Sequence, residues 1–215
     1  MTSPASDSLK EIIDRLDARI QRVDEERWLS SRYANSAGRD ALIVLYAFYY
    51  ELARVRLAVT DPTLGQIRFQ WWRDALAGID AGEVREHDLV LALADQVQPG
   101  RLNSHALIEL IDLHETAFLE NNRDLEPEAD LAILAGEVIA PEQEVTDLIR
   151  SIAPDWARLR RGEEAQQSLV GARVSSALRP ALGHYRLRWS WRKGHQPSPS
   201  GRRLSILLAI MTGKI

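Results

Sequence analysis

The stretch that decides the fold runs from residue 39 to residue 59 and reads RDALIVLYAFYYELARVRLAV. Its first half is apolar nearly all round a helix, which is typical of a central helix that is buried on every side. Asp61 and Pro62 end this helix, because the residue before a proline disfavours the helical conformation. Proline suits the opening turn of a helix, so we expect the next helix to run from about Thr63 to Ile79, with Gly82 beyond its end.

Helical spacing of apolar residues continues on both sides of this stretch. Ser8 and Glu11 form the pattern of a capping box for a first amphipathic helix, and Asp24 is placed to cap a second one. We expect the later helices over residues 89–97, 106–119, 129–139 and 145–152, one opened by Pro154, and a last pair that flanks the 194–201 loop. The sequence therefore predicts an all-α fold, as a single domain of about nine or ten helices over residues 1–215, with residues 1–5 disordered.

Composition excludes several classes of function. The chain has 215 residues, a net charge of -4 and no cysteine. The acidic balance lacks the basic footprint of nucleic-acid binders, so we expect no nucleic-acid partner. Disulfides, thiolate metal sites and a cysteine nucleophile are excluded, which agrees with a reducing cytoplasm. No segment has the roughly 20 apolar residues that a membrane-spanning helix needs, so we expect a soluble cytoplasmic protein.

Two consecutive segments resemble the squalene/phytoene synthase family. The first contains LYAFYYELARVR within residues 39–56, and the second reads LGQIRFQWWRDALAGI over residues 64–79. The resemblance implies an isoprenoid-synthase fold, here shortened in its second half. It also implies the family's activity, the head-to-head joining of two prenyl diphosphates in terpenoid biosynthesis, with Mg²⁺ held by aspartate-rich motifs. Carboxylates and hard cations offset the charge of the leaving diphosphate in such a reaction.

The chain departs from this pattern where the family's first metal-binding motif should stand. By the resemblance, Ala53, Arg54 and Leu57 occupy the places of the aspartates. An arginine repels a cation, so no metal ligand, no catalytic residue and no cofactor are expected here. The amino-acid sequence of these two segments is most similar to a degenerate branch of the family that includes a mitochondrial complex I assembly factor. The resemblance thus implies a pseudoenzyme that binds a prenyl or other lipid ligand, or a protein partner.

The candidate ligand-binding residues lie on the two helices that carry the resemblance. They are Tyr46, Tyr50, Glu51, Arg54, Arg68 and Trp71. A buried tyrosine hydroxyl needs a polar partner, and arginines on adjoining helices could form an anion pocket. Adjacent tryptophans point about 100° apart on a helix, so one of Trp71 and Trp72 can enter the core while the other lines a cavity.

Two alternative functions remain open. An active prenyl diphosphate transferase would use relocated acids such as Glu51 and Glu115 to hold Mg²⁺. A peripheral membrane adaptor would use the basic and aromatic segment 185–193, because basic segments with tryptophan bind anionic lipid surfaces. This second alternative would place the protein at the periphery of the inner membrane.

Overall fold

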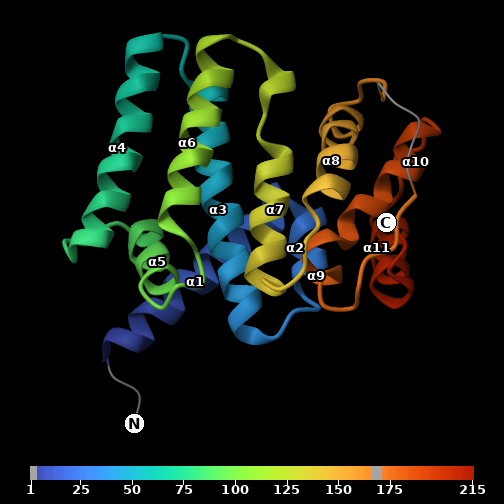
Figure 1. Cartoon of the computed structure of the whole chain (residues 1–215), viewed down its shortest axis with the longest axis horizontal. Coiled ribbons are helices and arrows are strands. Elements are labelled where there is room, and N and C mark those ends of the chain that lie inside the picture. Colours follow the sequence, from blue (N-terminus) through green and yellow to red (C-terminus); the bar gives the residue numbers. More distant parts are fainter. Residues whose placement is uncertain (1–3, 166–170) are drawn as a thin grey trace. The chain divides into compact units, whose positions relative to one another are not determined.

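The computed structural model describes residues 4–165 and 171–215, and their regular structure is helical apart from one isolated β-bridge (Figure 1). The predicted all-α fold is therefore confirmed. The described ranges hold α1 to α11, of which α9 and α10 have four and five residues, and two short 3-10 helices. None of these helices combines the length and apolar character needed to cross a membrane.

The chain divides into two compact units. The first unit comprises Met1–Val23 and Asp40–Pro127, and the second comprises Asp24–Arg39 and Glu128–Ile215. The expectation of a single domain over residues 1–215 stays a prediction. Of the five residues expected to be disordered, 1–3 lie outside the described residues, and α1 begins at Pro4.

The first unit is built around the helix predicted to be central. Its elements are α1 (Pro4–Val23), the larger part of α3 (Ser36–Ala58), α4 (Pro62–Ala81), α5 (Asp88–Val97), α6 (Ser104–Leu119) and the 3-10 helix η1 (Arg123–Leu125). Every residue of α3 from Ala41 to Tyr49 is buried, as its all-round apolar sequence predicts. Helices α4 and α6 lie side by side (Figure 1).

Helix α4 begins and ends at the residues that the sequence marks. The side chain of Asp61 accepts hydrogen bonds from the backbone N–H groups of Thr63 (2.8 Å) and Leu64 (3.1 Å), and Pro62 fills the first helical position. Gly82 ends the helix with a φ of 79°, a left-handed conformation that glycine adopts without steric cost. These caps fix the start and the end of the helix that carries Arg68 and Trp71.

The second unit contains the remaining helices. They are α2 (Glu25–Ser31), the start of α3 up to Arg39, α7 (Glu128–Ile139), α8 (Thr146–Arg160), α9 (Arg179–Leu182), the 3-10 helix η2 (Gly183–Leu187), α10 (Arg188–Arg192) and α11 (Pro199–Thr212). Trp156 is fully buried in this unit, and its ring contacts those of His184, Tyr185 and Trp191. This aromatic cluster joins α8 to η2 and α10.

Three expectations about helix boundaries were wrong. Because α1 already begins at Pro4, Ser8 lies inside the helix and does not cap it. Asp24 precedes α2, but its side chain makes no capping hydrogen bond, because arginines occupy its carboxylate. Pro154 lies within α8 and does not open a new helix. Burial of the flanking Ile152 and Trp156 holds this helix together across a residue that lacks an N–H donor.

Candidate ligand-binding site between α3 and α4

Four of the six predicted site residues come together in a small pocket of the first unit. Glu51 and Arg54 from α3 and Arg68 and Trp71 from α4 line it, and its volume is about 150 Å³. Glu51 and Arg54 are three residues apart on α3, and so are Arg68 and Trp71 on α4. This spacing places both members of each pair on one face of their helix. The two faces meet because the ring of Trp72 packs against that of Phe48, with the ring centroids 5.3 Å apart.

The two predicted tyrosines do not line this pocket. Tyr46 is almost completely buried, with 2% of its surface exposed. Tyr50 is half-buried, and the guanidinium of Arg19 lies over its ring, 5.2 Å from the centroid. A ligand-binding role for either tyrosine stays a prediction.

Trp71 and Trp72 divide their roles as the helical step between adjacent residues predicts. Trp72 is 6% exposed and belongs to the core, whereas Trp71 is 36% exposed. The guanidinium of Arg85 lies 5.3 Å from the ring of Trp71, and the ring of His87 lies 5.4 Å from it. A half-exposed indole held by its neighbours is a rigid apolar contact surface.

The charge of the pocket is positive. Glu51 forms ion pairs with Arg19 and with Arg54, the latter at 3.3 Å, so its carboxylate is already neutralised. Arg68 is exposed, and no carboxylate of the described residues pairs with it. Arg73, on another face of α4, pairs with Asp112 and Glu115 of α6. The excess guanidinium charge at Arg54 and Arg68 therefore favours an anionic or carboxylate-bearing ligand.

These residues do not fit the magnesium diphosphate that the family's enzymes bind. The positions that correspond to the aspartates carry a methyl group at Ala53, a guanidinium at Arg54 and an isobutyl group at Leu57, which is 72% exposed. Glu115, the other acid of the enzyme alternative, is bound to Arg73. Within residues 4–165 and 171–215, no group of three or more His, Asp or Glu side chains is arranged to hold a metal ion.

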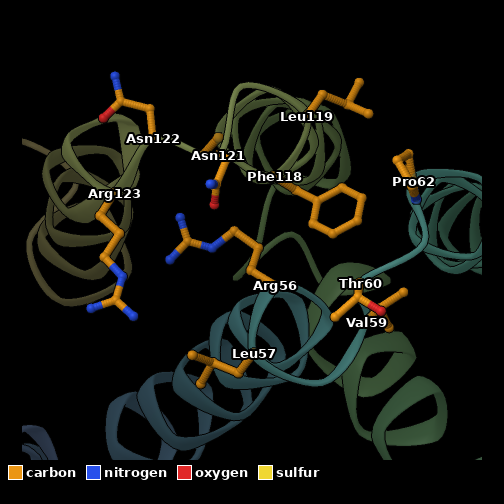
Figure 2. Close-up of a pocket in the computed structure, with 11 residues that line it drawn as sticks. Arg56, Leu57, Val59, Thr60, Pro62, Phe118, Leu119, Asn121, Asn122 and Arg123 are labelled. Atoms are coloured by element: carbon orange, nitrogen blue, oxygen red, sulfur yellow. The ribbon is translucent and has the colours of Figure 1, made fainter.

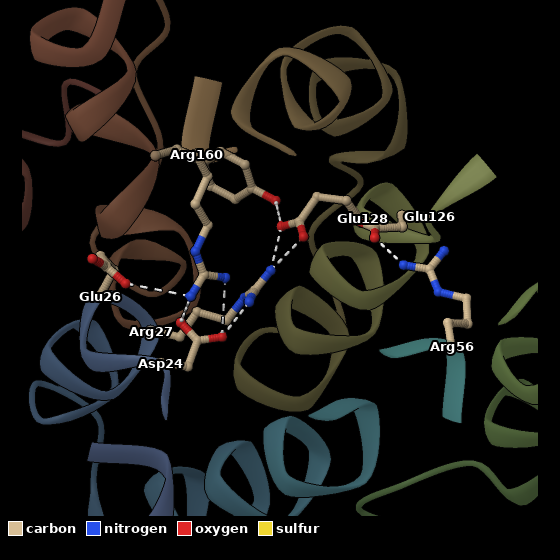
Figure 3. A network of polar contacts seen from close by, with 8 residues as sticks. Asp24, Glu26, Arg27, Arg56, Glu126, Glu128 and Arg160 are labelled. Carbon is tan, nitrogen blue, oxygen red and sulfur yellow. Dashed lines mark hydrogen bonds and ion pairs between the residues drawn. The ribbon is translucent and has the colours of Figure 1, made fainter. Parts of the chain in front are cut away.

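A larger cavity, which the sequence analysis missed, lies in the same unit at the C-terminal end of α3, directly after the residues that α3 contributes to the small pocket. It has a volume of about 420 Å³ and lies between the end of α3, the start of α4 and the turn after α6 (Figure 2). Arg56 extends toward Asn121 there and forms an ion pair with Glu126 (Figures 2 and 3). The only signal in the sequence was the Asn121–Asn122 turn, in which Asn121 adopts a positive φ of 47°.

His114 lies fully buried in the first unit, where its ring contacts that of Tyr49 at 4.7 Å. Burial and, to a smaller extent, the nearby positive charge of Arg56 together lower the pKa of His114 to about 3. The ring is therefore neutral at pH 7, and it serves as a core residue of α6.

The second unit contains a buried network of charges that no sequence pattern predicted (Figure 3). Arg27 of α2 forms ion pairs with Asp24 and with Glu128 of α7, and Tyr185 donates a hydrogen bond of 2.9 Å to Glu128. Arg160 of α8 lies 3.0 Å from Asp24. Burial alone would raise the pKa of Asp24, but the charges of Arg160 and Arg27 outweigh it and lower that pKa to about 2.

The all-α fold and the α3–α4 segment agree with the comparison to known families. Residues 20–135, more than half of the chain, match the family model for squalene/phytoene synthase. The chain belongs to the squalene/phytoene synthase family.

Among individual proteins, the chain is similar to the human and bovine proteins called NADH dehydrogenase (ubiquinone) complex I, assembly factor 6. Each is 26% identical to it over 96 residues, which cover 45% of this chain and 29% of the relative. The chain thus matches less than a third of the length of these relatives. No solved structure matches the chain.

Proposed function

We propose that this protein is a non-catalytic member of its family that binds a partner protein, as an assembly factor for a respiratory NADH dehydrogenase. The observation that carries the proposal is the chemistry at the family's metal-binding positions. Ala53, Arg54 and Leu57 offer an apolar and cationic surface there, in place of three carboxylates. Without bound cations, the departure of diphosphate loses its main electrostatic support.

The size of the pocket favours protein binding over an enclosed prenyl chain. Ligand pockets usually measure about 300–1,000 Å³. The volume of about 150 Å³ beside Arg54 and Trp71 is well below this range. The same residues border a surface that side chains of a partner protein could cover. The site therefore suits a protein partner better than a lipid tail.

One face of α4 has the character of a protein interface. Leu64, Ile67 and Trp71 are 56%, 59% and 36% exposed, and their spacing of three and four residues aligns them along the helix. Arg68 lies beside them on the same helix and carries an unpaired charge within the described chain. Tryptophan and arginine are enriched at the energetic centres of interfaces. We propose that this face, called the α4 face below, takes an apolar partner segment that carries a carboxylate.

The relatives support the cellular context of this proposal. The human and bovine proteins are named as assembly factors of complex I, and the matched 96 residues make up nearly half of this chain. We therefore propose subunits of NADH dehydrogenase as the partners, in the cytoplasm or at the periphery of the inner membrane. No cofactor is part of the proposal.

The test is genetic complementation in the native host. Deletion of the gene should lower the amount of assembled NADH dehydrogenase on native gels, and the wild-type chain should restore it. Ile67→Glu should fail to restore it, because a carboxylate on the apolar α4 face is costly to bury in an interface. Leu113→Glu, at a residue of α6 that is 37% exposed, is the matched control and should restore assembly. Normal assembly in the deletion strain, or full restoration by Ile67→Glu, would refute the proposal.

A second measurement addresses the enzyme alternative directly. The purified chain is incubated with Mg²⁺ and farnesyl or geranylgeranyl diphosphate, and released diphosphate is measured. We expect no release above the rate of a blank without protein. Turnover at an ordinary enzyme rate, about 1 per second or faster, would overturn the non-catalytic assignment.

A further inference from the structure

A second cationic pocket lies in the second unit, and none of its lining residues is used by the proposed function. It has a volume of about 400 Å³. Its wall includes the three basic side chains of Arg173, Arg186 and Lys214 and the indole of Trp189, which is 39% exposed. Of the basic segment 185–193, only Arg186 and Trp189 border this pocket.

Backbone pairing brings the three cations together. Residues 172–174 run antiparallel to residues 213–215, with hydrogen bonds between the N–H of Ile215 and the carbonyl of Ala172 (3.0 Å) and between the N–H of Ala172 and the carbonyl of Ile215 (3.3 Å). Arg173 is the direct bridge partner of Lys214. Side chains of directly opposed residues leave the backbone on the same face. Arg186 joins them by donating a hydrogen bond of 3.1 Å to the carbonyl of Lys214.

This arrangement is electrostatically unfavourable by itself. Like charges directly opposite each other on paired strands destabilise the pairing. No side-chain carboxylate of the described residues forms an ion pair with Arg173, Arg186 or Lys214, whereas Arg202 at the start of α11 pairs with Glu25 at 3.0 Å. No side-chain carboxylate of the described residues therefore offsets the charge of these three side chains.

We propose that this pocket binds a phosphate group, carried either by the head group of an anionic phospholipid or by a soluble phosphate ester. Guanidinium groups match the oxygens of phosphate in charge and geometry. A Cβ atom at Gly171 would lie 3.2 Å from the ring of Trp189, so the backbone closes tightly on this indole and holds it as a wall of the pocket. The site is independent of the α4 face, and its failure would leave the proposed function intact.

A neighbouring feature distinguishes the two sources of phosphate. Helix α11 ends at Thr212, two residues before Lys214, and carries a row of exposed apolar side chains. They are Leu204, Leu207, Leu208 and Met211. This α11 row would enter the interfacial region of a bilayer in the lipid case, but a soluble ester would not need it.

The experiment uses the full chain and two kinds of probe. Co-sedimentation with phosphatidylcholine vesicles, with and without phosphatidic acid, tests the lipid source. The soluble source is tested by titration with inorganic phosphate and with glycerol 3-phosphate, with binding measured by tryptophan fluorescence. Acetate at equal ionic strength is the control anion. Arg173→Glu should weaken binding at least about tenfold, because it replaces a charged hydrogen-bond donor by a repelling charge. Lys193→Glu makes the same change in charge at an exposed residue outside the pocket and should leave binding unchanged.

The outcomes separate the sources and test the site. Sedimentation that depends on phosphatidic acid and is lost in Leu208→Ser supports the lipid source. A fluorescence change with soluble phosphates that disappears in Trp189→Phe supports the soluble source. If no probe binds more tightly than acetate or neutral vesicles, or if Arg173→Glu binds like the wild type while circular dichroism shows both folded, the proposal is wrong.

Discussion

Replacing Arg27 by methionine is the sharpest test of what holds the second unit together. Arg27 is 2% exposed and forms ion pairs with Asp24 and Glu128. Methionine fills a similar volume but leaves two buried carboxylates without this cation. Removal of one partner from a buried ion pair typically costs about 3–5 kcal/mol. Asp24 keeps Arg160 as a partner, so we place the expected loss at the lower end, about 3 kcal/mol.

The measurement is urea unfolding at pH 7, followed by tryptophan fluorescence. The matched control is Arg54→Met, at a 48% exposed arginine that is paired with Glu51 three residues earlier. An exposed pair of this kind contributes roughly 0.5 kcal/mol or less. The double variant Arg27→Met with Glu128→Met should recover part of the loss, because it also removes one stranded carboxylate. A cost for Arg27→Met no larger than that of Arg54→Met would refute the assignment of Arg27 as a buried structural cation.

Two further predictions concern the first unit. In Gly65→Ala, the new methyl group would lie 2.2 Å from the ring of Phe118. This overpacking should lower the free energy of unfolding by about 1–3 kcal/mol. In the control Gly136→Ala, the nearest atom is 3.4 Å away, and the change should be close to neutral. Because the pKa of His114 in the folded state is about 3, below its ordinary 6.5, only the unfolded chain takes up this proton between pH 7 and pH 5. The free energy of unfolding should therefore decrease as the pH is lowered from 7 to 5. His114→Gln should remove roughly 2 kcal/mol of this decrease. His105→Gln, at a side chain that is 81% exposed, should remove none of it. Equal stabilities of the two glycine variants, or parallel pH profiles for wild type and His114→Gln, would contradict these expectations.

Local signals in the sequence predicted much of the fold. The apolar run around Val44 and the caps at Asp61 and Gly82 depend on residues close to them in the sequence. The helices that they form can therefore be predicted without knowing the tertiary structure. The pocket residues Glu51, Arg54, Arg68 and Trp71 could be predicted because they share helical faces on consecutive helices.

The errors arose where distant residues decide the outcome. Asp24 has the local pattern of a helix cap, yet its carboxylate is taken by Arg160, 136 residues later in the chain. Pro154 has the pattern of a helix start, yet the burial of Trp156 continues α8 through it. The cationic pocket around Arg173 depends on pairing with residues 213–215, and neither short segment has the length or alternation of a strand.

The buried charges around Arg27 also bear on how the second unit opens. Through Asp24, Arg160, Glu128 and Tyr185, this network joins α2, α7, α8 and η2. Detachment of α2, α7 or α8 would separate a buried charge from a partner, and detachment of η2 would remove a hydrogen bond from the buried Glu128, so the separate opening of any of the four costs free energy. Their amide hydrogens should consequently exchange with deuterium at a common rate, as one cooperative folding unit, more slowly than those at the exposed start of α11.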